Sequence, residues 1–254
     1  MKKLFLFSLG LICMIGNAYA EPSTLDKVLE SKTLRVCTTG NYSPYTMRKE
    51  HGTFEGLDIS MAQSLAESLD AKIEFKQISW KNLVSEFIAN KCDIAVGGIS
   101  ITLERQQQVY MTEAMLMDRK VAYIRCKDTD KYRSLNDLNN KNVRVNEIDG
   151  DANDAFARKQ LPNAQRQVFD NIDVIRQNIM DEKADVVITD ELANFYDPTN
   201  TICLMNKGKG PILAYGERGY MLPKGDATWK RYVDNWLRST MSSEYHLFAE
   251  KWLN

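Results

Sequence analysis

Short apolar stretches alternate with amphipathic ones along most of the chain. Seven apolar stretches are typical of strands: Leu34–Thr38, Lys72–Gln77, Asp93–Val96, Val121–Arg125, Val143–Val145, Gln167–Phe169 and Asp185–Thr189. Apolar residues at helical spacing predict four helices: Leu57–Leu69, Trp80–Asn90, Asp154–Gln160 and Ile172–Glu182. The last forty residues are also expected to be helical, with an apolar stripe through Trp229, Val233, Trp236 and Leu237. Strands that alternate with helices in this way predict an α/β protein with mostly parallel sheets.

Two further extended stretches indicate how the chain is divided. Lys120–Asp128 and Lys209–Glu217 flank a self-contained middle segment. We therefore predict a discontinuous first lobe of residues 21–123 plus 215–254 and a second lobe of residues 124–214. The two stretches would join the lobes, and a ligand cleft is expected between them.

The first twenty residues have the pattern of a secretory signal peptide. Two lysines precede a short apolar run, which ends in a small-x-small cleavage signal at Ala18–Ala20. The run is short for a membrane anchor, and Cys13 lacks the small preceding residue of a lipoprotein. We predict cleavage before Glu21 and export, to the periplasm if the cell is Gram-negative.

Composition narrows the possible partners and cofactors. The 33 basic and 34 acidic residues give a net charge of −1 without a basic cluster, which argues against a nucleic-acid partner. The two histidines, His51 and His246, each stand alone in the sequence. The chain therefore offers few ligands for a zinc site and few candidates for the histidine of a Ser-His-Asp triad. We expect neither a metal nor a cofactor.

Four cysteines remain after the predicted cleavage. Cys37 and Cys92 lie in apolar runs and are interpreted as buried thiols. Cys126 and Cys203 have more polar surroundings, and an exported protein meets an oxidising compartment. We predict a Cys126–Cys203 disulfide, with two free thiols as the alternative.

The stretch "GGISITLERQQQVY", residues 97–110, carries the clearest candidate chemistry. Glycines at a strand end let the backbone approach a small anion closely. Ser100 and Thr102 offer hydroxyls, and Arg105 can hold a carboxylate through two parallel hydrogen bonds. The alternative is a surface arginine on a helix that begins near Leu103.

Three longer segments resemble a known family. They are "LRVCTTGNYSPYTMRKEHGTFEGLDISMAQSLAESL", "KCDIAVGGISITLERQQQVYMT" and "KADVVITDELAN". They are similar in order and spacing to type II periplasmic solute-binding proteins of the amino-acid class. The resemblance covers essentially the whole mature chain, and it implies a two-lobed α/β fold with the ligand between the lobes.

Shorter motifs resemble one branch of that superfamily, the cyclohexadienyl dehydratases. These motifs are "TTGNYSPY", "SWKNL", "GISITLERQ", "DRK", "NDAFAR" and "RYVDNWL". Members of the branch convert prephenate or arogenate into phenylpyruvate or phenylalanine. In the wider family the arginine that matches Arg105 binds the ligand carboxylate, with donors at the positions of Ser100 and Thr102.

Four more residues are candidates for the ligand site. Asp190 ends an apolar strand and would receive a ligand ammonium, as in amino-acid binders; the alternative is a helix N-cap. Tyr42 and Trp80 would form flat walls, although such residues are often core. Lys120 would meet a second carboxylate, or is an ordinary exposed lysine.

The sequence departs from the dehydratases at the position of their general acid. Their glutamate, three residues after the aspartate, corresponds to Ala193 here, which carries no proton. Glu191 lies two residues earlier, and in a helical turn this is a rotation of about 200° to nearly the opposite face. Asp154 is another candidate acid.

Two other departures change the charge of the expected site. Asp151 and Ala152 replace a Gly-Thr pair whose threonine binds the carboxylate, so one hydrogen bond is lost and repulsion is added. Arg119 replaces a small residue, and its charge could compensate for Asp151.

Three functions are compatible with these features. The chain could bind an amino acid or related carboxylate and deliver it to the membrane component of an ABC transporter. It could be an active dehydratase with a relocated acid, or a binding protein without a transport partner. We expect ligand binding in the dehydratase-like branch, by a monomer or weak oligomer.

Overall fold

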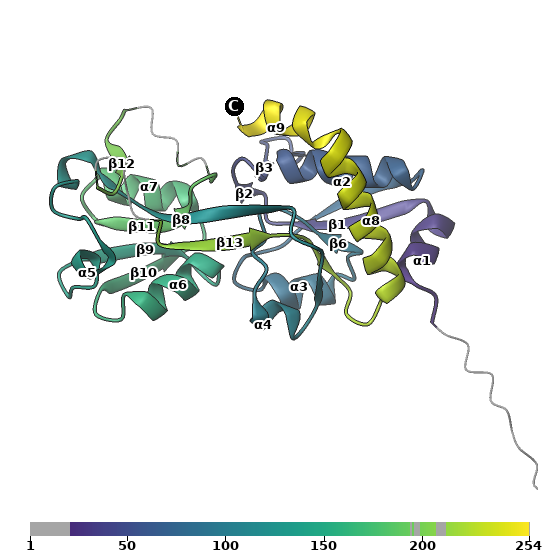
Figure 1. The fold of residues 1–254 in the computed structure, drawn as a ribbon, viewed down its shortest axis with the longest axis horizontal. Helices are drawn as coiled ribbons and strands as arrows, with labels where there is room; N and C mark the ends of the chain where they lie inside the picture. Colours follow the sequence, from purple (N-terminus) through teal and green to yellow (C-terminus); the bar gives the residue numbers. More distant parts are fainter. Residues whose placement is uncertain (1–20, 194, 196–198, 207–211, 254) are drawn as a thin grey trace, which may run out of the picture.

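The protein has two lobes joined by long strands (Figure 1). A computed structural model describes residues 21–193, 195, 199–206 and 212–253. The predicted signal peptide lies outside these residues. None of the helices in the described ranges is long and apolar enough to cross a bilayer.

The first lobe is built on a five-stranded sheet in the order β5-β1-β6-β14-β7. Its strands are β1 (Thr33–Thr38), β5 (Lys72–Gln77), β6 (Ile94–Ala95), β7 (Tyr110–Met111) and β14 (Met221–Leu222). Six helices accompany it: α1 (Thr24–Ser31), α2 (Leu57–Ser68), α3 (Leu83–Ala89), α4 (Leu103–Gln106), α8 (Ala227–Ser243) and α9 (Tyr245–Leu253). Helices α2 and α9 lie on one side of the sheet, and α3 and α4 lie on the other (Figure 1).

A small antiparallel sheet in the order β2-β3-β4 lies beside this lobe. Its strands are β2 (Asn41–Tyr42), β3 (Thr46–Arg48) and β4 (Phe54–Glu55). They are too short to give a periodic signal, and the sequence did not predict them. They place Tyr42 and Tyr45 near the second lobe, where both hydroxyls bond to carboxylates.

The second lobe has a six-stranded sheet with β10-β9-β11-β8-β12 as its path and β13 paired to β8. The strands are β8 (Leu116–Arg125), β9 (Arg144–Ile148), β10 (Gln165–Phe169), β11 (Val186–Asp190), β12 (Ile202–Leu204) and β13 (Ala214–Arg218). The helical segments are η1 (Cys126–Asp128), α5 (Leu135–Leu138), α6 (Ala152–Gln160) and α7 (Ile172–Met180).

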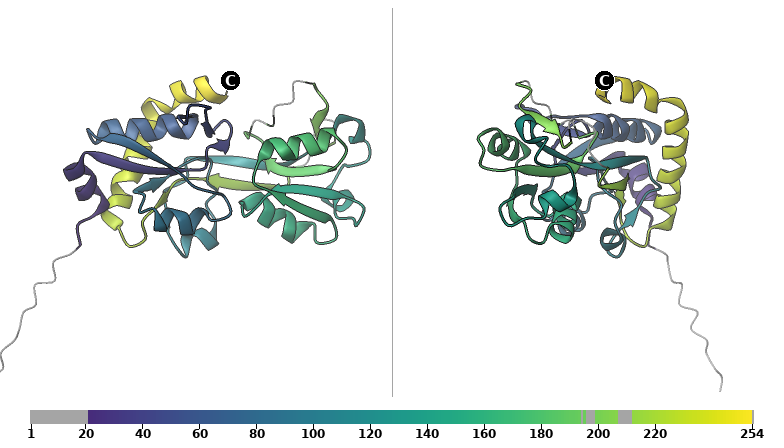
Figure 2. Two further views of the ribbon diagram at one scale, coloured as in Figure 1. Left: turned by 180° about the vertical axis from the view of Figure 1, so that it is seen from behind. Right: turned by 60° about the vertical axis from the view of Figure 1, so that its left-hand side comes forward.

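Strands β8 and β13 form the connection between the lobes, side by side and antiparallel (Figures 1 and 2). Their register pairs Lys120 with Ala214 and Leu116 with Arg218. The predicted boundaries at 123/124 and 214/215 fall inside these two strands, because each strand runs on from one lobe into the other.

The strand and helix predictions are confirmed, with a difference in sheet direction. Strands β5, β1 and β6 are parallel, as are β10, β9 and β11, but β14 and β8 pair antiparallel to their neighbours. A chain that crosses to the other lobe and returns must reverse direction, so each sheet is mixed. The predicted C-terminal stripe is buried, as expected.

Two disulfides are present. The Cys126–Cys203 bond joins η1 to β12, as the sequence predicted. The interpretation of Cys37 and Cys92 as separate thiols is wrong, because they form the other disulfide. Strands β1 and β6 pair with Val36 beside Ile94, which brings the segment before β6 next to Cys37. This pairing joins residues far apart in the sequence, which no local pattern reveals.

Candidate functional site

A cavity of about 770 Å³ lies where both lobes and the connecting strands meet. The first lobe contributes residues from Trp80 to Ser85 and from Ser100 to Gln108, and the second contributes residues between Gly150 and Lys159. Five of the seven predicted ligand-binding residues line it: Trp80, Ser100, Thr102, Arg105 and Lys120. The other two, Tyr42 and Asp190, contact these lining residues instead.

Backbone geometry positions the segment that leads to Arg105. Gly97 and Gly98 both have positive φ, and their N–H groups donate to the Asp58 carboxylate at 3.0 and 2.7 Å. A Cβ on Gly97 would lie 2.7 Å from a methyl group of Thr46, so a side chain would not fit. The glycines therefore serve the turn before Ser100.

Arg105 is buried in the cavity wall rather than exposed on the surface. Its backbone N–H donates to the hydroxyl of Thr102, the N-cap of α4, and its Nη1 donates to the Ser100 carbonyl at 2.7 Å. The residue is 8% exposed. In the described ranges no carboxylate forms an ion pair with it. Burial lowers the pKa of Arg105 to about 10, Asp151 opposes this shift, and Arg218 reinforces it.

Asp190 ends β11, contacts the lining residue Lys120, and is 1% exposed. Its carboxylate accepts hydrogen bonds from the Tyr42 hydroxyl at 2.5 Å, Lys120 Nζ at 3.2 Å and Asn153 Nδ2 at 3.2 Å. Residues 191–193 form a turn rather than a helix, so the alternative role of Asp190 as a helix N-cap is wrong. Burial alone would raise the pKa of Asp190, but Arg218 and Lys120 hold it below its usual value.

Arg218 is a central residue that the sequence analysis missed. It ends β13, is 1% exposed, and forms an ion pair with Asp190 through Nη2. Its Nη1 donates to the Ser100 hydroxyl, and Ser100 and Arg218 also form a β-bridge. Neither its Nε nor its Nη2 makes a hydrogen bond in the described structure, so its contact with Asp190 is an ion pair only. A weak signal was its place directly after the extended stretch Lys209–Glu217.

Asp151 is the N-cap of α6, and it lines the cavity. Its carboxylate accepts from the backbone N–H groups of Asn153 and Asp154 at 2.9 and 2.7 Å. Burial raises the pKa of Asp151 to about 6, although the N–H of Asp154 and the charges of Lys120 and Arg105 oppose the rise. A carboxyl group with such a pKa can exchange protons near neutral pH.

The expected compensation of Asp151 by Arg119 is wrong. Side chains alternate along β8, so Lys120 faces the cavity, whereas Arg119 lies on the other side and pairs with Glu191. Glu191 is therefore engaged away from the site.

Asp154 is also committed elsewhere. It is buried, and it pairs with Arg166 and, at 3.5 Å, with Arg158. Ala193 is buried and is not among the residues that line the cavity. Neither Asp154 nor Glu191 is a free acid at the site.

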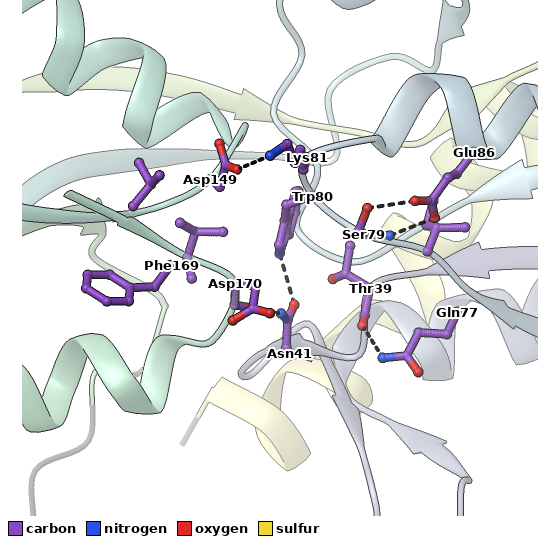
Figure 3. A pocket seen from close by; sticks show the side chains of 13 residues that line it. Thr39, Asn41, Gln77, Ser79, Trp80, Lys81, Glu86, Asp149, Phe169 and Asp170 are labelled. Carbon is purple, nitrogen blue, oxygen red and sulfur yellow. Dashed lines mark hydrogen bonds and ion pairs between the residues drawn. The ribbon is translucent and has the colours of Figure 1, made fainter. Parts of the chain in front are cut away.

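A second cavity of about 780 Å³ shares Trp80 and Lys81 with the first (Figure 3). Lys81 forms an ion pair with Asp149 of the second lobe at 2.9 Å, and Trp80 Nε1 donates to Asn41 at 3.0 Å. A Cβ on Gly150 would lie 2.7 Å from Lys81 Cα, so the lobes are in close contact. The contacts of Lys81 with Asp149 and Gly150 therefore join the two lobes beside both cavities.

Tyr42 and Trp80 pack edge to face, with ring centroids 5.5 Å apart. Only Trp80 of this pair lines the cavity, whereas Tyr42 acts through its hydroxyl on Asp190. Within the described part of the chain, no three His, Cys, Asp or Glu side chains group as a metal ion would require. The site therefore offers cations, hydroxyls, the carboxyl group of Asp151 and the aromatic side chains of Trp80, Phe156 and Tyr215.

The chain belongs to the bacterial extracellular solute-binding proteins, family 3, whose pattern matches residues 34–254. It is 36% identical to the cyclohexadienyl dehydratase of Pseudomonas aeruginosa over 97% of this chain and 92% of that protein. It is 21% identical to the L-cystine-binding protein TcyJ of Escherichia coli over 94% of this chain and 89% of that one.

Solved structures carry the same fold. The crystal structure of the ancestral amino acid-binding protein AncCDT-1, a precursor of cyclohexadienyl dehydratase, matches with a TM-score of 0.84. The identity is 28%, over 91% of this chain and all of that one. The two-lobed α/β fold expected from the sequence is confirmed.

Proposed function

We propose that the protein binds a small amino acid or related carboxylate in the cavity between its lobes. The observation that carries the proposal is Arg105, a buried guanidinium at the cavity wall without a carboxylate partner in the described ranges. A buried charge is costly unless it is paired, so a ligand carboxylate is its natural partner. The amino-acid-binding relatives support the same class of ligand.

We further propose that the protein acts in the periplasm and delivers its ligand to the membrane component of an ABC transporter. Support comes from the family, which is described as extracellular, and from the leader-like residues 1–20. Lobes joined by two strands can close on a ligand by a hinge motion.

Calorimetric titration of the purified protein with a panel of amino acids and oxo acids tests the binding. Arg105→Lys keeps the charge but loses the bidentate hydrogen bonding to a carboxylate. We expect the affinity for the ligand to fall by about 10–100-fold. Arg158→Lys is the matched control, because this exposed arginine lines the same cavity. Unchanged binding by Arg105→Lys would place the carboxylate elsewhere.

A second candidate function is dehydration of prephenate, which the 36% identity to cyclohexadienyl dehydratase favours. The leaving hydroxyl departs as water only if an acid gives it a proton. Asp151 is the buried carboxyl group that lines the cavity, and burial raises its pKa to about 6. For this activity we propose Asp151 as the acid in place of the family glutamate.

Turnover of prephenate to phenylpyruvate at neutral pH, above the spontaneous rate, tests this second function. Asp151→Asn can still cap α6, because asparagine is a good N-cap residue, but it has no acidic proton. Activity that is lost in both Asp151→Asn and Arg105→Ala would establish the enzyme. Absence of turnover in the unmodified protein would leave binding alone.

A further inference from the structure

The carboxylate expected to receive a ligand ammonium already has a full set of partners. Asp190 accepts from the hydroxyl of Tyr42, the amide of Asn153 and the ammonium of Lys120, and it pairs with Arg218. A carboxylate offers about four acceptor positions. Three of them are taken by hydrogen bonds, and the ion pair with Arg218 places a guanidinium against the oxygen that also accepts from Lys120. All four partners are side chains of the protein itself, so Asp190 has them without a ligand.

The charge around Asp190 also opposes an ammonium. Its single negative charge is shared by Lys120 and Arg218, and all three side chains are buried. Arg105 adds a third cation at the cavity wall. A ligand ammonium near Asp190 would lose its water, find no free oxygen, and be repelled by two cations.

Lys120, by contrast, can still donate. Its Nζ carries three protons and has two partners in the described structure, Asn153 and Asp190. Because Lys120 lines the cavity, the remaining proton is available to an oxygen of the ligand.

We propose that the cavity selects carboxylic acids with an oxygen rather than an ammonium on the α-carbon, that is, 2-oxo or 2-hydroxy acids. The inference rests on the proposed function, in which Arg105 holds the carboxylate. The α-oxygen then accepts from Lys120. Asp190 positions Lys120 and does not touch the ligand.

Asp151 is the competing acceptor for an ammonium. It lines the same cavity, but one of its oxygens already accepts two backbone N–H groups of α6. Its charge is also opposed by the nearby cations Arg105 and Lys120. The test therefore includes Asp151→Asn.

Calorimetry with matched pairs tests the selectivity, using phenylalanine against phenylpyruvate, glutamate against 2-oxoglutarate, and leucine against its oxo acid. We expect the oxo acid of the best-binding pair to bind about 10–100-fold more tightly. Equal or tighter binding of the amino acid overturns the inference but leaves the proposed function intact if Arg105→Lys weakens it. If the amino acid binds more tightly and this preference for the amino acid disappears in Asp151→Asn, Asp151 is the group that receives the ammonium. Binding by neither member of any pair overturns both proposals.

Lys120→Gln isolates the residue that sets the preference. The amide of glutamine can still donate hydrogen bonds, but the substitution removes one cation beside Asp190. We expect the preference for the oxo acid to shrink by about tenfold. Lys81→Gln is the control, because it removes a lysine charge from the same cavity without a contact to Asp190, and the preference should stay as in the unmodified protein. An unchanged preference in folded Lys120→Gln contradicts the assigned role.

Discussion

Two buried charges at one site have opposite surroundings. Asp190 is surrounded by donors, including two cations, whereas Arg105 has a carbonyl contact and no carboxylate partner in the described part of the chain. Burial of both is costly, but only Asp190 is compensated within the protein. The difference supports the two proposals made above, that Asp190 positions its neighbours and that Arg105 binds the ligand carboxylate.

The largest effect should follow from Asp190→Asn. The change leaves Arg218 and Lys120 buried without their counter-charge, and removal of one partner from such a cluster costs about 3–5 kcal/mol in the free energy of unfolding. Urea unfolding measures it. The control is Glu113→Gln, which breaks an exposed pair with Arg238 and should cost less than about 1 kcal/mol. Similar losses in the two variants would mean that the cluster is not a structural unit.

Arg105→Gln should separate function from stability. It removes a buried charge that lacks an ionic partner, so the relief of desolvation offsets the lost bond to Ser100. We expect the free energy of unfolding to change by less than about 1 kcal/mol while carboxylate binding is lost. A destabilisation as large as that of Asp190→Asn would show that Arg105 is structural too.

The affinity for a carboxylate should rise as the pH falls through about 6. Asp151, whose pKa burial raises to about 6, is mostly ionised above that pH and repels the ligand anion beside Arg105. Below it, Asp151 becomes neutral, whereas a ligand carboxylate stays ionised down to about pH 4. We expect about tenfold tighter binding at pH 5 than at pH 8.

Asp151→Asn tests the origin of this pH dependence, because the variant retains an N-cap side chain. Titrations at both pH values should give nearly equal affinities in the variant. If the affinity of Asp151→Asn still depends on pH, another group is responsible for the titration.

The smallest effect is expected at the rim, in Lys81→Gln. The ion pair between Lys81 and Asp149 joins the lobes, but the lysine side chain is largely exposed, and such pairs contribute little. We expect less than about a twofold change in affinity. A loss comparable with that of Arg105→Lys would mean that closure of the lobes, rather than the buried cations, controls binding.

The sequence predicted the long elements well because their burial pattern is local. Helix α2 and strands β1 and β5 begin and end close to their predicted residues. Strands β2, β3 and β4 have two or three residues each, which is too short for any period to show. Their existence depends on pairing with each other and on packing between the lobes.

The candidate site was also predicted only in part: the residues close together in the sequence were predicted correctly, and a contact that depends on the strand was not. Ser100, Thr102 and Arg105 share one short stretch, and the structure keeps them together at the cavity. The expected compensation of Asp151 by Arg119 failed, because the alternation of β8 directs Arg119 away from the cavity and into a pair with Glu191.

By itself, the sequence determined the α/β architecture, the two extended connections and the stretch that carries Arg105, because each depends on a pattern of residues close together in the sequence. Only the tertiary structure decided that Cys37 bonds to Cys92, that Arg218 reaches Asp190, and that Asp190 is surrounded by partners from within the protein. The physical reason is distance along the chain. These contacts join residues brought together by sheet pairing and by the return of β13, and the energy of a buried charge depends on every neighbour that folding supplies.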